Sequence, residues 1–158
     1  MIDPHHTVTL PPDATHLTRD TFSNGRLVVY QHKTGYRFSI DAVLLAGFVR
    51  LKKADRLMDL GCGCGIISLM LAHRFSAIKI YGVEIQPSLV SLSMRNVTEN
   101  NMNDRIRILE RDINTLSQEM SRGPVDIISA IHPLGGHVPA ESIRIRKAPW
   151  PAMRSRSP

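Results

Sequence analysis

The sequence predicts an α/β fold organised around a doubly wound, Rossmann-like parallel sheet. Two observations carry this prediction: strand patterns alternate with helical patterns from residue 56 onward, and a glycine-rich turn joins the first of these strands directly to a helix. Strands that alternate with helices form parallel βαβ units. The expected elements are strands at 57–60, 79–84, 106–110 and 125–129 and helices at 66–74 and 87–100.

A β-hairpin and a short helix are expected ahead of this sheet. Apolar runs at 21–22 and 27–30 flank an Asn-Gly pair, which favours a hairpin because both residues tolerate a positive φ. Ser39 is expected to cap a helix of about ten residues. Residues 1–20 show no periodicity, so we expect a flexible arm there, followed by one domain over 21–129.

Composition indicates one globular domain and narrows the class of protein. The chain has 158 residues, 42% hydrophobic and 22% charged, and a net charge of +6. Residues 138–158 hold five cations and one acid, a net of +4, which leaves +2 for the rest and only weak support for nucleic-acid binding. No segment is long and apolar enough to span a membrane, and no secretory signal is visible. We therefore expect a cytoplasmic protein.

Two cysteines flank the middle glycine of the turn. Cys62 and Cys64 are separated by one residue, which suits neither a disulfide nor the usual metal-ligand spacing. We expect reduced thiols and no metal site.

Three acidic residues lie at or just after the carboxyl ends of three successive expected strands. Asp59, Glu84 and Asp112 would therefore meet at the carboxyl edge of the sheet, where doubly wound folds bind their ligands. Glu84, at the end of the second strand, is expected to accept both hydroxyls of an adenosine ribose. The spacing predicts an adenosine-containing ligand.

The glycine turn distinguishes between such ligands. Asp59-Leu-Gly61-Cys-Gly63-Cys-Gly65 is not the G-x-G-x-x-G pattern of dinucleotide sites, and it resembles motif I of S-adenosylmethionine-dependent methyltransferases. A carboxylate at Asp59 would repel a pyrophosphate but suit the ammonium group of a methionine moiety. S-adenosyl-L-methionine is thus the expected cofactor, and the alternative is that these residues only form tight turns and caps.

A closer resemblance lies upstream and covers about residues 18 to 129. The segments Lys33-Thr-Gly-Tyr-Arg-Phe-Ser-Ile-Asp-Ala-Val-Leu-Leu-Ala46, Gly82-Val-Glu-Ile-Gln86 and Asn96-Val-Thr-Glu-Asn100 are similar to the bacterial tRNA (adenine-N6)-methyltransferase family, which modifies the adenine 3′ of a valine tRNA anticodon. The resemblance implies the N-terminal half of a class I methyltransferase sheet, strands 1 to 4, with S-adenosyl-L-methionine as cofactor and tRNA as partner.

The resemblance also implies roles for individual residues. Asp59 and the three glycines would hold the methionine end of the cofactor, Glu84 the ribose and Asp112 the adenine. Residues 35–41 would cover the cofactor, with Tyr36, Arg37 and Asp41 close to it. For these three the alternatives are packing for Tyr36, a surface charge for Arg37 and a favourable helix-dipole position for Asp41.

The family pattern stops after the fourth strand. Members carry Asn-Pro-Pro-Tyr or Asn-Pro-Pro-Phe there, whereas this chain reads Ala130-Ile-His-Pro-Leu-Gly-Gly-His137, so no catalytic residue is assigned. Codons permitted for Ser129–Pro158, read in a shifted frame, encode S-N-P-P-L-R-R-T and later G-R-I-N-P and A-R-H-E. We hypothesise that residues 130–158 are an aberrant, frameshifted tail and that the chain is inactive as written.

Without its missing partners, the fourth strand would present an exposed apolar edge, which predicts a marginally stable or aggregating product. Two other functions stay open: a methyltransferase for protein glutamine or DNA, and a non-catalytic binder of S-adenosylmethionine or RNA.

Overall fold

The computed structural model describes residues 16–35, 37–53, 55–121, 123–131 and 146–147. It contains a two-stranded sheet, β1-β2, and a five-stranded sheet of order β5-β4-β3-β6-β7 whose first four strands are parallel. The α/β prediction and the positions of its four parallel strands are confirmed. These strands are β3 (Arg56–Leu60), β4 (Lys79–Glu84), β5 (Ile106–Glu110) and β6 (Ile127–Ala130).

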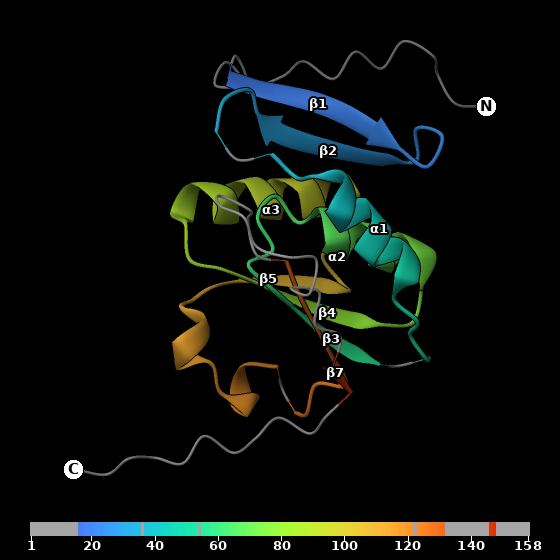
Figure 1. The fold of residues 1–158 in the computed structure, drawn as a ribbon, viewed down its shortest axis with the longest axis vertical. Helices are drawn as coiled ribbons and strands as arrows, with labels where there is room; N and C mark the ends of the chain where they lie inside the picture. Colours follow the sequence, from blue (N-terminus) through green and yellow to red (C-terminus); the bar gives the residue numbers. More distant parts are fainter. Residues whose placement is uncertain (1–15, 36, 54, 122, 132–145, 148–158) are drawn as a thin grey trace.

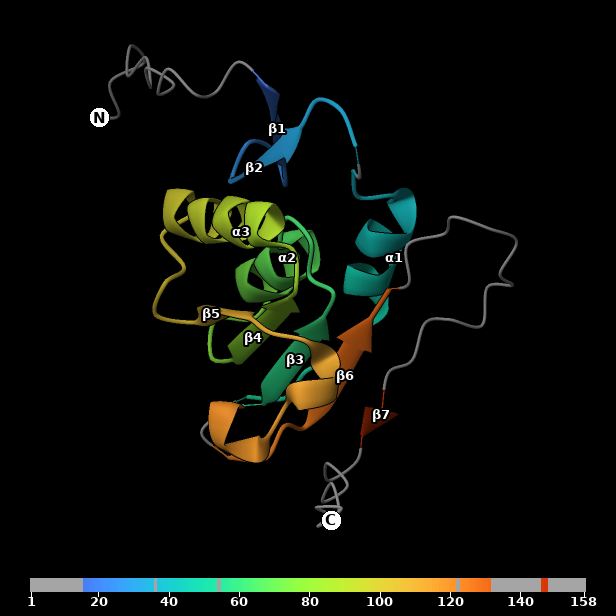
Figure 2. The same ribbon diagram turned by 90° about the vertical axis from the view of Figure 1, so that its left-hand side faces the viewer.

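Three helices cover one face of the sheet, and the hairpin lies beyond them (Figures 1 and 2). They are α1 (Ile40–Phe48), α2 (Ile66–Arg74) and α3 (Pro87–Glu99). The other face carries a smaller apolar cluster around Met58, Tyr81 and Val83, together with the two 3-10 helices η2 (Ile113–Thr115) and η3 (Gln118–Ser121). None of the helices in the described ranges is long and apolar enough to cross a membrane.

The hairpin forms as predicted but begins earlier. β1 (Leu17–Phe22) pairs antiparallel with β2 (Leu27–His32). The strand therefore includes residues 17–20, which were expected in the flexible arm, because these residues pair in register with the far end of β2. Residues 1–15 lie outside the described ranges.

Helix α1 starts where expected, but Ser39 does not cap it by a side-chain hydrogen bond. Its hydroxyl donates to Asp41 Oδ2 at 3.2 Å instead of accepting a backbone N–H. The predicted position of the cap is therefore right and the predicted interaction is wrong. Asp41 nonetheless lies in the first turn of the helix, where the helix dipole favours a negative charge.

The outer edge of β6 is partly paired, which corrects the expectation of a fully exposed strand. β7 (Arg146–Lys147) adds antiparallel to β6 opposite Ile127 and Ile128. The expected tail thus contributes one short strand, and Ala130, its expected first residue, ends β6. Residues 132–145 and 148–158 lie outside the described ranges.

Two asparagines attach the hairpin to the helix layer: Asn96 in α3 and Asn100, which follows the last residue of that helix. Asn96 Oδ1 accepts the Tyr30 amide at 2.8 Å, and Asn96 Nδ2 donates to the carbonyls of Tyr30 and Cys64 at 3.0 and 2.8 Å. One turn later, Asn100 makes the same pair of bonds with Val28, at 2.9 and 2.6 Å. The side-chain amides replace a neighbouring strand along the edge of β2, which explains the Asn96–Asn100 spacing.

We expect Asn96→Ala to destabilise the chain by about 3 kcal/mol, because it leaves three buried backbone groups without partners. Asn100→Ala should cost about 1 kcal/mol, since its partners are only partly buried and water can replace it. Urea unfolding of both variants tests this difference. Equal losses would show that burial of Asn96 does not matter.

Candidate cofactor site

The glycine turn between β3 and α2 depends on backbone conformations that favour glycine. Gly61, Gly63 and Gly65 have φ values of 67°, 56° and 83°. The amides of Gly61 and Cys62 donate to the Val83 carbonyl at 2.8 and 3.0 Å, which fixes the turn against the end of β4. The three predicted glycines therefore build one turn at the carboxyl edge of the sheet.

Gly82 is a further requirement of this turn that the motif alone does not explain. A Cβ placed on Gly82 would lie 2.9 Å from Cys62 Sγ and 2.8 Å from Ile108 Cδ1. A larger residue here would force the Cys62 and Ile108 side chains to shift, so Gly82 leaves room for Cys62 to pack beneath the turn. Both turn cysteines are free and buried, and burial raises the pKa of Cys64 to about 11 and that of Cys62 well above its ordinary value.

Glu84 holds the turn through its carboxylate. Oε2 accepts the Gly63 amide at 3.0 Å, and Oε1 accepts the amides of Ile85 and Gln86 at 2.9 and 3.0 Å. A carboxylate offers about four acceptor positions, so about one is left, on Oε2. The structure leaves about one acceptor position for a ribose hydroxyl, and the expectation that Glu84 accepts both hydroxyls stays a prediction.

Asp59 is buried, with an exposed fraction of 1%. Its Oδ2 accepts the Ser68 hydroxyl at 2.8 Å, and its Oδ1 accepts the Ser129 hydroxyl at 2.9 Å. It therefore joins β3, α2 and β6 and presents no open face to an ammonium group. Sequence analysis missed both serines, although each is a polar residue inside an apolar run.

Burial raises the pKa of Asp59 from 3.8 to about 6. The serine hydroxyls oppose this shift, and the neighbouring Glu84 charge adds to it. Loss of solvation exceeds the benefit of the hydrogen bonds.

Asp112 lies next to Glu84 at the same edge of the sheet. The Arg111 amide donates to the Glu84 carbonyl at 3.0 Å, which brings the end of β5 against the end of β4. Asp112 Oδ1 accepts the Asn114 amide at 2.8 Å and so caps η2. The structure thus brings the three predicted acids to one edge and gives each a different local role.

The segment at 35–41 is attached to the hairpin. The Arg37 guanidinium lies 3.1 Å from Asp20 Oδ2 and donates to Thr18 Oγ1 at 2.8 Å. The buried Gln31 reinforces this attachment, because it donates to Asp20 at 2.7 Å and accepts the Phe38 amide at 3.2 Å. Arg37 is therefore engaged with β1, and Tyr36 lies outside the described residues.

Arg37 still influences the glycine turn electrostatically, since its charge lowers the pKa of Cys64 against the larger effect of burial. Among the described residues, the Asp41 carboxylate bonds to Ser39, its near neighbour in the chain. Within the described part of the chain, no three His, Cys, Asp or Glu residues gather as a metal site would require.

We expect the Asp59 titration to appear as a pH-dependent stability. The unfolded chain loses this proton near the ordinary value of 3.8 and the folded chain near about 6, so ionisation favours unfolding across that interval. Relative to Asp59→Asn, the free energy of unfolding should fall by up to about 3 kcal/mol between about pH 4 and about pH 7. Urea unfolding at several pH values measures this, and parallel pH profiles for the two chains would contradict it.

Comparison with known proteins places this site in a family. Residues 38–131, more than half of the chain, match the family described as ribosomal protein L11 methyltransferase (PrmA). The protein named tRNA1(Val) (adenine(37)-N6)-methyltransferase from Yersinia enterocolitica is 29% identical over 98 residues, which are 61% of this chain and 39% of that protein. Its namesake from Yersinia pestis is 32% identical over 61% of this chain and 40% of its own length. These relatives confirm the resemblance found in the sequence, and the chain spans about two fifths of their length.

Solved structures show the same fold at low identity. YjhP from E. coli superimposes with a TM-score of 0.52 at 18% identity, over 64% of this chain and 40% of that one. A SAM-dependent methyltransferase from Geobacter sulfurreducens in complex with S-adenosyl-L-homocysteine gives a TM-score of 0.50 at 18% identity, over 60% of this chain and 36% of that one. The fold is that of S-adenosylmethionine-dependent methyltransferases, and the chain belongs to the methyltransferase family described as ribosomal protein L11 methyltransferase (PrmA).

Proposed function

We propose that the chain is the cofactor-binding part of an S-adenosyl-L-methionine-dependent methyltransferase that modifies the N6 amino group of a tRNA adenine. The family match and the names of the Yersinia relatives support this proposal. The observation that carries it is the glycine turn held by Glu84 at the carboxyl edge of the sheet. A tRNA substrate would place the protein in the cytoplasm.

The residues present fit an adenosine-containing cofactor. Glu84 Oε2 keeps one acceptor position for a ribose hydroxyl, beside a turn whose glycines leave the backbone open to the methionine end. Asp112 is assigned to the adenine, with Oδ2 making no hydrogen bond among the described residues. When bound, S-adenosyl-L-methionine supplies the methyl group.

The other proposed cofactor-binding residues act less directly. Asp59, in β3, fixes α2 through Ser68 and β6 through Ser129. Tyr36, Arg37 and Asp41 belong to the segment proposed to cover the cofactor, by resemblance to the family.

Catalysis would require a group that the sequence after β6 does not supply. The family's Asn-Pro-Pro would follow this strand, and its amide oxygen would accept the amino hydrogens of the adenine. Here Ile131-His132-Pro133 follows Ala130. We propose that the segment from 130 is frameshifted and that the chain as written transfers no methyl group.

We expect S-adenosyl-L-homocysteine to bind the full chain and Glu84→Gln to weaken binding at least about tenfold, because an amide cannot replace both acceptor oxygens. Glu110→Gln is the matched control, since Glu110 pairs with Glu84 in register and its side chain is exposed. Calorimetric titration gives both affinities, and thermal unfolding checks that each variant folds. Equal affinities for the two variants would remove Glu84 from the site.

We expect no transfer of radiolabelled methyl groups to an unmodified valine tRNA transcript by the chain as written. Transfer would show that the chain is a complete enzyme and would exclude frameshift inactivation. Cofactor binding without transfer to tRNA, DNA or a protein glutamine would agree with the proposal. Resequencing the gene across the codons for 124–136 then decides whether a one-base correction restores Asn-Pro-Pro.

A further inference from the structure

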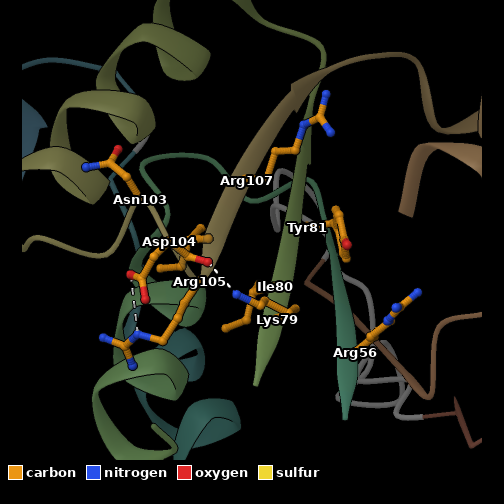
Figure 3. Close-up of a pocket in the computed structure, with 9 residues that line it drawn as sticks. Arg56, Lys79, Ile80, Tyr81, Asn103, Asp104, Arg105 and Arg107 are labelled. Carbon is orange, nitrogen blue, oxygen red and sulfur yellow. Dashed lines mark hydrogen bonds and ion pairs between the residues drawn. The ribbon is translucent and has the colours of Figure 1, made fainter. Parts of the chain in front are cut away.

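A basic pocket lies at the amino edge of the sheet, opposite the glycine turn. It has a volume of about 420 Å³ and lies at the beginnings of β3, β4 and β5 (Figure 3). Four cations line it: Arg56, Lys79, Arg105 and Arg107. Parallel strands bring these residues together because their amino ends share one edge. The length of β4 from Lys79 to Glu84 separates this edge from the glycine turn by roughly 17 Å.

The cationic side chains at this edge hydrogen-bond mainly to uncharged backbone carbonyls. Lys79 Nζ donates to the carbonyl of Asp104 at 2.6 Å, and the Arg105 guanidinium donates to the Ala72 carbonyl. Within the described ranges, Arg107 has an exposed side chain with no hydrogen bond or ion pair. Carbonyl partners orient cations without cancelling their charge.

Acidic groups at the edge neutralise only part of this charge. Asp104 is the one acid among the described lining residues, and its carboxylate lies 3.8 Å from Arg105 Nε with 73% of the side chain exposed. The Arg105 side chain is 20% exposed, and at 3.8 Å from a carboxylate that is largely in solvent its charge is only partly neutralised. Asp126 accepts the Arg56 backbone amide at 2.8 Å, so it too lies near the row. Asp55 lies at the same edge, because its carbonyl accepts the Lys79 amide at 3.2 Å. Among the described residues, the four cations still outnumber these three acids.

The cations form a row and not a single point. Arg56 and Lys79 are register partners on β3 and β4, and Tyr81 and Arg107 are register partners on β4 and β5. Three adjacent strands span about 10 Å. Consecutive phosphates of one helical strand advance about 3.4 Å along the helix axis and lie farther apart than that through space. The row therefore suits two neighbouring phosphates better than one small anion.

We propose that Arg56, Lys79, Arg105 and Arg107, here called the basic edge, bind the phosphodiester backbone of RNA. The identification of this RNA as tRNA rests on the proposed function. The basic edge would make a second contact with the tRNA, about one strand length from the reacting base. Contacts to phosphates position an RNA without reading its sequence. The basic edge therefore supplies affinity and orientation, and the opposite edge holds the cofactor.

The test measures binding of the full chain to a fluorescent, unmodified valine tRNA transcript by anisotropy over a range of salt concentrations. The test variant is the double charge reversal Lys79→Glu/Arg107→Glu. The matched control is Arg19→Glu/Arg26→Glu, which makes the same change in net charge at exposed hairpin positions. We expect the test variant to lose at least about tenfold in affinity and to reduce the salt slope by about two, and the control to bind nearly as the unmodified chain does.

Equal losses in the two double variants would overturn the proposal, because net charge alone would then explain binding. Competition by polyglutamate as effective as that by unlabelled tRNA would also overturn it, since the edge would then accept any polyanion. If the charge reversal prevents folding, the milder variant Lys79→Gln/Arg107→Gln replaces it. We expect this variant to lose at least about threefold in tRNA affinity. An unchanged tRNA affinity would overturn the proposal.

Binding of S-adenosyl-L-homocysteine to the same variants separates this inference from the proposed function. Retained cofactor affinity with lost tRNA affinity supports both. A chain that binds cofactor but shows no dependence on the basic edge overturns only the inference. A chain that binds tRNA through the basic edge but no cofactor overturns only the proposed function.

Discussion

The side-chain amide of Asn96 is the contact on which the arrangement of this molecule depends. It is fully buried and satisfies three backbone groups, two on the hairpin strand β2 and one on the glycine turn. In the part of the chain that the structure describes, none of the three groups has another strand beside it to take this role. One residue of α3 thereby sets the hairpin, the helix and the turn in a fixed relation. The 35–41 segment depends on this relation, because it is bonded to the hairpin and carries residues proposed to face the cofactor.

The sequence predicted the elements whose causes are local. The alternation of strands and helices, the Asn-Gly hairpin and the glycine turn each depend on neighbouring residues, and all three form. The misplaced features depend on distant pairing. Leu17 is in a strand because it pairs with His32, and Arg146 is in one because it pairs with Ile128. No pattern among the neighbouring residues predicts either of these strand pairings.

The candidate site was predictable in position and less so in role. Asp59, Glu84 and Asp112 reach one edge because parallel strands end there. What each carboxylate does depends on which donors surround it, and those donors come from other elements. Hydroxyls enclose Asp59, backbone amides hold Glu84, and Asp112 caps a 3-10 helix. Three acids that look equivalent in the sequence are thus distinguished by their environments.

The hydrogen bond from the Gly63 amide to Glu84 has a consequence for how a ligand would be received. The carboxylate that is proposed to touch the ribose also shapes the turn beside it, so the turn is already folded before any ligand arrives. Such preorganisation lowers the entropic cost of association. It also means that recognition and local folding share one side chain. The contributions of the turn and of Glu84 to ligand affinity therefore cannot be separated, because a change in one alters the other.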